Sequence, residues 1–197
     1  MTMDDDVARR LSAAYAQGTS DALKRWAATG RPGVLLLREF LDGTWEPEPT
    51  PGVFSRDLVD NTSALIAEIA AAQPEAFLET FESERYRDNS LVLTGLGQID
   101  DPRATKRLAR VSGSTNEWVR MQVAIGLGRR ASSVAIATLV RLLGDAEYLV
   151  RYHALRSLAT VGDASALAAL REHVPDSQHE RELAEQAIRS IEERAGR

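Results

Sequence analysis

The sequence predicts an all-α protein, a right-handed α-solenoid of stacked helix pairs. Two observations support this prediction: an internal repeat of about 31 residues, and the helical spacing of apolar residues within each copy. Segments that repeat at such a period form stacked units, each of which buries its apolar face only against its neighbours. The composition, with 44% apolar and 27% charged residues, is that of an ordinary globular domain. We therefore expect about five helix pairs in one solenoid domain.

The repeat is clearest in the second half of the chain. Residues 89–97 read NSLVLTGLG, residues 120–128 read RMQVAIGLG and residues 151–159 read RYHALRSLA, so successive copies lie at a constant offset of 31 (120 − 89 and 151 − 120). A fourth copy, AEQAIRSI at residues 184–191, aligns at a longer offset of 33 (184 − 151). Each copy marks the first helix of a pair, which we call helix A.

A turn and a second helix, called helix B, follow each helix A. The segment Glu117–Gly128 has apolar residues on one helical face, and its glycines suit the end of a helix. Ser133–Leu143 then carries apolar residues at i, i+3, i+4 and i+7, as expected for a helix B. The next repeat has its helix A at Glu147–Thr160, and Asp163 is placed to cap its helix B. Earlier in the chain, the same patterns predict helices over residues 57–72, from Pro74 onwards and from Pro102 onwards.

The first quarter of the chain is more divergent, as expected for the end of a repeat array. The proline-dense stretch within residues 43–54 cannot form a helix, and we interpret it as a surface loop. We divide the solenoid into a helical N-terminal cap at residues 1–54 and regular repeats at residues 55–197. The predicted helices of the cap are Asp4–Ala16, Ser20–Ala28 and Val34–Leu41, with a turn at residues 30–32.

The composition excludes several classes of function. The chain has no cysteine, so disulfides, thiol catalysis and cysteine-ligated metals are ruled out. Its longest apolar runs are too short to span a bilayer, and its acidic start lacks the features of a secretory signal. We expect a cytoplasmic protein, and the abundance of alanine and arginine favours a bacterial source. A net charge of −5 argues against nucleic-acid binding, which depends on cations that face phosphates.

No arrangement of residues points to catalysis. Zinc-protease, nucleophile-elbow and phosphate-loop motifs are absent from the sequence. The dyad His179-Glu180 has no counterpart in the preceding repeat, so we interpret it as solvated polar surface rather than a metal site. We therefore expect no catalytic residue, no metal and no cofactor.

Charged residues form two stripes at helical spacing. Glu75, Glu79 and Glu82 are spaced i, i+4, i+7, and an equally spaced set of arginines follows at an offset of 28 (103 − 75). The stripes are interpreted either as a ladder of exposed ion pairs or as a docking surface for a partner protein. The candidate partner-binding residues are Glu79, Glu82, Arg103, Lys106, Arg107, Arg110 and Arg141.

Aromatic residues form a second candidate surface. Tyr86, Trp118 and Tyr148 lie at or just before the start of a helix A, which places them along one edge of a solenoid. Such residues anchor many interfaces, but this spacing is also typical of packing between repeats.

Several short motifs recur with the repeat. Val119-Arg120 and Val150-Arg151 open two copies of helix A, Leu127-Gly128 closes one, and Asp101-Pro102 forms a turn. Over residues 85–194 this pattern resembles HEAT-like repeats, in particular the short bacterial form first noted in phycobilin lyase subunits. The resemblance implies that the recurring arginines have a structural role and that the B helices line a concave surface.

The resemblance implies a surface for holding a partner. Our leading hypothesis is a non-enzymatic protein–protein interaction module, a scaffold or adaptor that binds its partner on the concave B-helix face. The first alternative is a DNA-binding protein of the lesion-glycosylase type, and the second is an accessory subunit of a lyase-type enzyme or a metal hydroxylase. The fold alone cannot choose among them.

Overall fold

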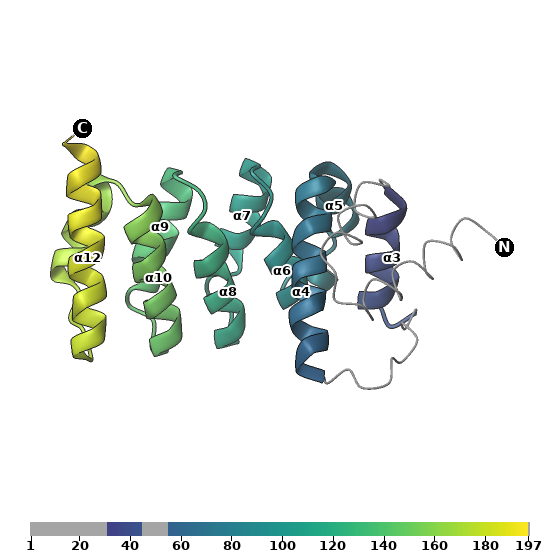
Figure 1. Ribbon diagram of the computed structural model, residues 1–197, viewed down its shortest axis with the longest axis horizontal. Coiled ribbons are helices and arrows are strands. Elements are labelled where there is room, and N and C mark those ends of the chain that lie inside the picture. Colours follow the sequence, from purple (N-terminus) through teal and green to yellow (C-terminus); the bar gives the residue numbers. More distant parts are fainter. Residues whose placement is uncertain (1–30, 45–54, 197) are drawn as a thin grey trace. The chain divides into compact units, whose positions relative to one another are not determined.

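A computed structural model describes residues 31–44 and 55–196, and every regular element over these residues is a helix. The chain divides into two compact units, residues 1–99 and residues 100–197, each built from stacked helices (Figure 1). The predicted helices Asp4–Ala16 and Ser20–Ala28 lie outside the described residues, as does most of the proline-dense loop. The predicted boundary at residue 54 also lies outside them and stays a prediction.

The first unit contains four described α-helices. Helix α4 packs against α6, and α3 packs against α5. Helix α3 begins at Arg31, so the predicted turn at residues 30–32 is wrong for its last two residues. Pro32 lies in the first helical turn, where its missing N–H group would have had no helical acceptor. The elements are α3 (Arg31–Leu41), α4 (Ser55–Ala72), α5 (Pro74–Thr80), the short 3₁₀ helix η1 (Glu84–Tyr86) and α6 (Ser90–Leu96).

Aromatic rings form the core of the first unit. The ring of Phe81 lies 4.7 Å from that of Phe77 and 5.1 Å from that of Tyr86, measured between centroids. Helix α6 passes close to this cluster at Gly95, where an added Cβ would lie 2.3 Å from Cζ of Phe77. The absence of a side chain at Gly95 therefore allows α6 to contact the ring.

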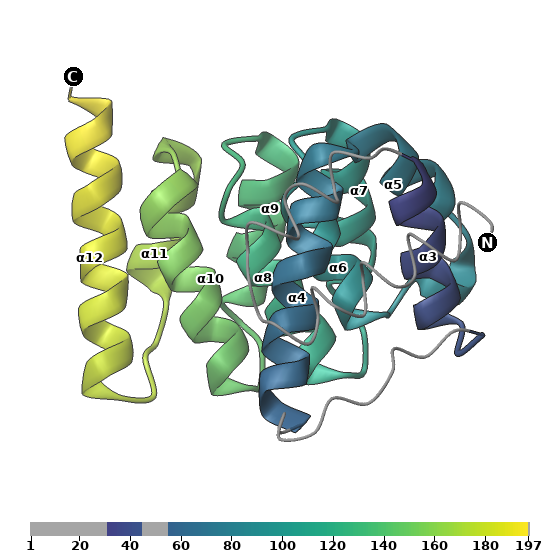
Figure 2. The same cartoon turned by 45° about the vertical axis from the view of Figure 1, so that its right-hand side comes forward.

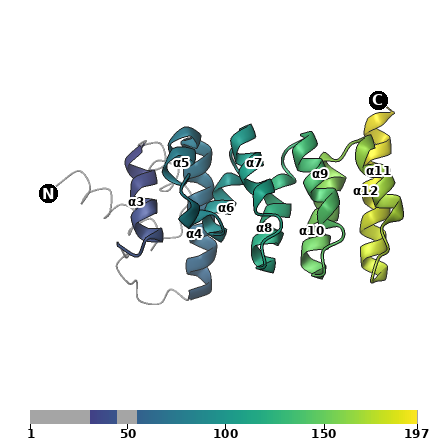
Figure 3. The same ribbon diagram turned by 180° about the vertical axis from the view of Figure 1, so that it is seen from behind.

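The second unit is a stack of helix pairs in two layers. Helices α8, α10 and α12 pack side by side in what we call the A layer (Figures 1 and 2). Helices α7 and α9 pack together in the second layer, the B layer, which continues into η2 and α11 (Figure 3). The elements are α7 (Pro102–Arg110), α8 (Glu117–Leu127), α9 (Ser133–Leu142), α10 (Tyr148–Val161), the 3₁₀ helix η2 (Ala164–Ala166), α11 (Leu167–Glu172) and α12 (Gln178–Ala195).

Side-chain caps set where the helices of the second unit begin. Asp101, Asn116, Ser132 and Ser177 each accept a hydrogen bond from a backbone N–H group in the first turn of the following helix. Asp163 also caps, as predicted, but the element that follows it is the 3₁₀ helix η2. The expected continuous helix B of this repeat is therefore split into η2 and α11.

The last helix A begins closer to its predecessor than the aligned segments indicate. Helix α10 begins at Tyr148 and helix α12 at Gln178, so the starts of these helices are separated by 30 residues (178 − 148) rather than by the 33 of the aligned segments. The buried residues of the two helices still correspond at the predicted spacing of 33, because Ala154 and Leu158 on α10 match Ala187 and Ile191 on α12. Counted from the capping residues Glu147 and Ser177, Glu180 occupies the position that the buried Val150 holds one repeat earlier.

Candidate functional site

The recurring arginines connect neighbouring repeats of the second unit. Arg120 donates two hydrogen bonds to Asp145, from Nε to Oδ2 at 2.6 Å and from Nη2 to Oδ1 at 2.9 Å. Its Nη1 atom donates to the carbonyl oxygen of Ser114 at 2.8 Å. One repeat later, Arg151 donates to Asp176 at 2.5 Å and to the carbonyl oxygen of Asp145 at 2.9 Å. The predicted structural role of Arg120 and Arg151 is therefore confirmed.

The acidic partners of these arginines were not among the predicted residues, although the sequence contains a signal for them. The interval along the chain from Arg120 to Asp145 equals the interval from Arg151 to Asp176. An aspartate that recurs with the repeat period, at a fixed number of residues after a recurring arginine, indicates an ion pair between successive repeats.

Glu180 is a fully buried carboxylate at the start of α12. It accepts hydrogen bonds from Nε of Arg151 at 2.7 Å and from the backbone N–H group of Asp176 at 3.1 Å, and Nε2 of His173 lies 3.1 Å away. The prediction that the His179-Glu180 dyad is solvated surface is thus wrong for Glu180, whereas His179 is exposed. The register of α12 directs Glu180 inward, and Arg151 supplies the opposite charge.

The contacts of Glu180 and Asp145 with the arginines favour the charged forms of these carboxylates. Burial raises the pKa of Glu180, but hydrogen bonds from Arg151 and from the Asp176 N–H group outweigh it, so the pKa lies below its ordinary value. The pKa of Asp145 is lowered in the same way, because hydrogen bonds from Arg120 outweigh the effect of burial. The hydrogen bonds to Asp145 and Glu180 raise the pKa values of Arg120 and Arg151. The arrangement is therefore suited to holding repeats together rather than to transferring protons.

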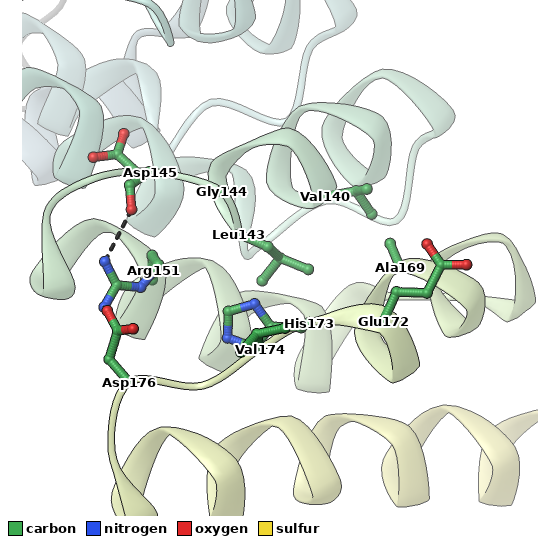
Figure 4. A pocket seen from close by; sticks show the side chains of 10 residues that line it. All are labelled: Val140, Leu143, Gly144, Asp145, Arg151, Ala169, Glu172, His173, Val174 and Asp176. Carbon is green, nitrogen blue, oxygen red and sulfur yellow. Dashed lines mark hydrogen bonds and ion pairs between the residues drawn. The ribbon is translucent and has the colours of Figure 1, made fainter.

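A pocket lies between the last two repeats (Figure 4). All three nitrogen atoms of the Arg151 side chain donate hydrogen bonds to protein acceptors, and Nε2 of His173 contacts Glu180. The principal polar groups of this pocket are thus engaged within the protein. The lining residues are Val140, Leu143, Gly144, Asp145, Arg151, Ala169, Glu172, His173, Val174 and Asp176.

The B layer of the second unit carries a concentrated positive charge. Helices α7 and α9 contain five cationic residues and no acidic residue, although the whole chain has a net charge of −5. Because α7 packs against α9, these cations belong to one surface, which we call the basic face. The basic face consists of Arg103, Lys106, Arg107 and Arg110 on α7 and Arg141 on α9.

The members of the basic face differ in how they are held. Nη2 of Arg103 lies 2.8 Å from Oδ2 of Asp101, the residue that caps α7. Arg141 donates a hydrogen bond to Oγ of Ser112, and that hydroxyl donates to a backbone carbonyl. Lys106 and Arg110 are exposed and form no ion pair with any described residue. These two side chains are therefore available to a binding partner.

The predicted acidic stripe lies in the first unit and departs from the prediction. Glu79 is exposed on α5, but that helix ends at Thr80, so Glu82 lies beyond it and does not share a helical face with Glu79. The residue that follows the helix, Phe81, is buried in the aromatic core. The proposed pairing between the acidic and basic stripes stays a prediction.

The predicted aromatic edge separates into two kinds of residue. Tyr86 is buried and donates a 2.7 Å hydrogen bond to Oδ1 of Asp42, so its role is packing. Trp118 and Tyr148 are 55% and 38% exposed, so much of each side chain remains on the surface.

Two features are absent from the described part of the chain. No group of three or more histidine, aspartate or glutamate side chains among these residues is arranged to hold a metal ion. None of the described helices is long and apolar enough to cross a membrane.

The stacked helix pairs and the ion pairs between repeats define a helical-repeat protein of the α-solenoid class. The sequence profile of the family described as HEAT repeats matches residues 74–148 and 109–191, so the chain belongs to the HEAT-repeat family. Repeats of this family generally mediate protein–protein interaction. An engineered protein of known crystal structure is similar in fold, with a TM-score of 0.53 and 18% identity over 94% of this chain and 89% of that chain. No curated protein matches the sequence.

Proposed function

We propose that this protein is a non-enzymatic interaction module whose basic face binds an acidic segment of a partner protein. The observation that carries the proposal is the concentration of cations on α7 and α9, two adjacent helices without a carboxylate, in a chain whose net charge is −5. A local charge opposite to that of the whole molecule steers a complementary partner to one surface and disfavours wrong orientations.

The geometry of the basic face supports a protein partner of modest size. Lys106 and Arg110 lie one helical turn apart on α7, and Arg141 occupies the position on α9 that Arg110 holds one repeat earlier. Three exposed cations on two adjacent helices suit a short acidic segment that crosses both. In the proposal, Arg103 and Arg107 support this surface on α7.

A nucleic-acid ligand fits the same surface less well. The position equivalent to Arg141 in the next repeat is occupied by Glu172, which is exposed. A continuous groove that follows phosphates would require cations along successive repeats. The basic face ends after two helices, which favours a compact acidic segment.

The first experiment measures binding of a fluorescent ten-residue polyglutamate peptide by anisotropy. We expect the double variant Lys106→Glu/Arg110→Glu to bind at least about tenfold more weakly than the parent. The matched control is Arg181→Glu/Arg189→Glu on α12, where both arginines are exposed. Each double variant changes the net charge from −5 to −9 (−5 − 4), so a general charge effect would weaken both equally.

The second experiment identifies the class of the natural partner. The same three proteins serve as bait in a native lysate, and the captured material is analysed for protein and nucleic acid. One stoichiometric protein that binds the parent and the α12 control but not the α7 variant supports the proposal. Equal capture by all three baits rejects the basic face, and nuclease-sensitive capture replaces the protein partner with a nucleic acid.

A further inference from the structure

The A layer of the second unit exposes a group of apolar and aromatic side chains. Trp118 is 55% exposed and Ile125 is 37% exposed, and they lie two helical turns apart on one face of α8. Helix α10 packs against α8, and its residue Leu149, which is equivalent to Trp118 on α8, is 46% exposed. We call this surface the A-face patch; it consists of Trp118, Met121, Ile125, Tyr148, Leu149 and Tyr152.

Contacts around Tyr152 hold one side of this patch in place. The ring of Tyr148 lies 6.1 Å away, and the ring of His179 stacks at 5.9 Å, measured between centroids. The guanidinium of Arg156 lies 5.7 Å from the Tyr152 ring, and its Nη1 atom donates to the Tyr152 hydroxyl at 3.2 Å. Tryptophan, tyrosine, methionine and arginine are the residues enriched at protein interfaces, and ordered side chains lose little entropy on binding.

The two ends of the A-face patch carry opposite charges. Glu117 and Glu147 are exposed at the N-terminal ends of α8 and α10. Arg156 is exposed nearer the C-terminal end of α10, and Arg129 is exposed just beyond α8. Among the described residues, Glu117, Glu147 and Arg156 form no ion pair. The patch therefore has an apolar centre between a negative and a positive rim.

We propose that the A-face patch is a homodimer interface whose occupant is a second copy of this chain. A twofold axis in the plane of the interface, perpendicular to the helices, places α8 antiparallel to its counterpart and α10 antiparallel to its counterpart. This operation brings the negative rim of each copy against the positive rim of the other, so the surface is self-complementary, as a twofold interface requires. Glu147 then faces Arg156 of the partner subunit, and Trp118 faces Ile125 of the partner subunit.

Dimerisation would give the molecule two copies of the basic face. The basic face belongs to the B layer, and the A-face patch belongs to the A layer. Dimerisation through the A layer leaves both basic faces exposed, so one dimer presents two equal binding surfaces. A partner with two acidic segments would bind with higher avidity than a partner with one.

The first test is sedimentation velocity of the full chain over about 1–100 µM. We expect a monomer–dimer equilibrium, and Trp118→Ala should raise the dissociation constant roughly 30-fold, as expected for a central aromatic anchor. Val174→Ala is the control, because Val174 is an 82% exposed apolar residue outside the patch. A monomer throughout this range overturns the proposal, as does a dimer that Trp118→Ala and Val174→Ala weaken equally.

A charge exchange tests the antiparallel geometry. Glu147→Arg alone and Arg156→Glu alone should each raise the dissociation constant at least about tenfold, because each opposes like charges twice in the dimer. A mixture of the two single variants should recover the dimer, since every opposed pair then has opposite signs. Failure of the mixture to dimerise more tightly than either variant alone overturns the geometry. Peptide binding by the basic face is measured in parallel, and its retention by the monomeric variants separates this result from the proposed function.

Discussion

Nε of Arg151 donates a 2.7 Å hydrogen bond to Oε1 of Glu180, and both side chains are buried. This pair joins α10 and α12, the last two helices of the A layer. The counterpart of Glu180 in the preceding repeat is the buried apolar residue Val150. An apolar side chain at the position of Glu180 would need no opposite charge. A buried carboxylate requires the nearby guanidinium of Arg151 to offset the loss of its hydration. The final repeat is therefore attached by a charge pair whose members depend on each other.

Replacing Glu180 with glutamine should destabilise the protein. The substitution keeps the shape of the side chain but leaves the buried Arg151 without its main counter-charge, at a cost of roughly 3 kcal/mol in the free energy of unfolding. Urea denaturation followed by circular dichroism measures the change. Glu193→Gln, on the exposed side of α12, is the control and should change stability by less than about 0.5 kcal/mol. Equal stabilities of the two variants would show that the buried pair contributes nothing.

Stability should fall in acid, and the sign follows from the lowered carboxyl pKa values. In the folded state the pKa of Glu180 lies below its ordinary value of 4.5, and that of Asp145 lies below 3.8. The unfolded chain therefore binds more protons in this range, so the contribution is complete above about pH 5 and is lost as the pH falls through the folded pKa values. Urea titrations from pH 7 to pH 3 test this, and Glu180→Gln should show a shallower decline. Parallel curves would contradict the assignment.

The two repeat-related aspartates should differ in their effect on stability. The Asp145 side chain is 8% exposed and accepts two hydrogen bonds from Arg120, so Asp145→Asn should cost roughly 2 kcal/mol. The Asp176 side chain is 73% exposed, and Arg151 retains Glu180, so Asp176→Asn should cost less than about 1 kcal/mol. Chemical denaturation of the two variants measures the difference. The reverse order of stabilities would refute this account of the inter-repeat pairs.

A close approach of α8 and α10 should make Gly128 intolerant of a side chain. A Cβ atom at Gly128 would lie 2.2 Å from Oγ of Ser157 and 2.7 Å from its Cβ. That hydroxyl is fixed by a 2.8 Å hydrogen bond to the carbonyl oxygen of Ala124, so Gly128→Ala should cost about 1–3 kcal/mol. Thermal denaturation should show no comparable loss for Gly113→Ala, because nothing lies within 4 Å of a Cβ there.

The sequence predicted most of the helices because apolar spacing and capping residues act locally. Helices α8, α9 and α10 begin within one residue of the predicted positions, and α7 begins at Pro102 as the turn motif indicates. The errors arise where tertiary contacts override the local pattern. Helix α5 ends before Glu82, where the buried Phe81 follows it, and Glu180 on α12 is buried against Arg151 rather than exposed.

The basic face could be predicted from the sequence because its cations are close together on one helix and recur with the repeat. The acidic partners of the arginines were harder to recognise because they are distant along the chain. Asp145 pairs with Arg120, and Glu180 pairs with Arg151. Only the packed repeats bring these groups within hydrogen-bonding distance. The A-face patch was recognised only in part, from Trp118 and Tyr148, because a sequence does not show which apolar residues of a helix remain exposed.

By itself, the sequence determined the family, the helical class and the periodic placement of the recurring arginines, since these depend on local spacing and composition. The tertiary structure decided which charged residues are buried and which are exposed. The physical reason is that burial depends on the register between neighbouring helices. The starts of α8 and α10 are 31 residues apart, whereas the starts of α10 and α12 are 30 apart. This shift of one residue accompanies the inward placement of Glu180 opposite Arg151.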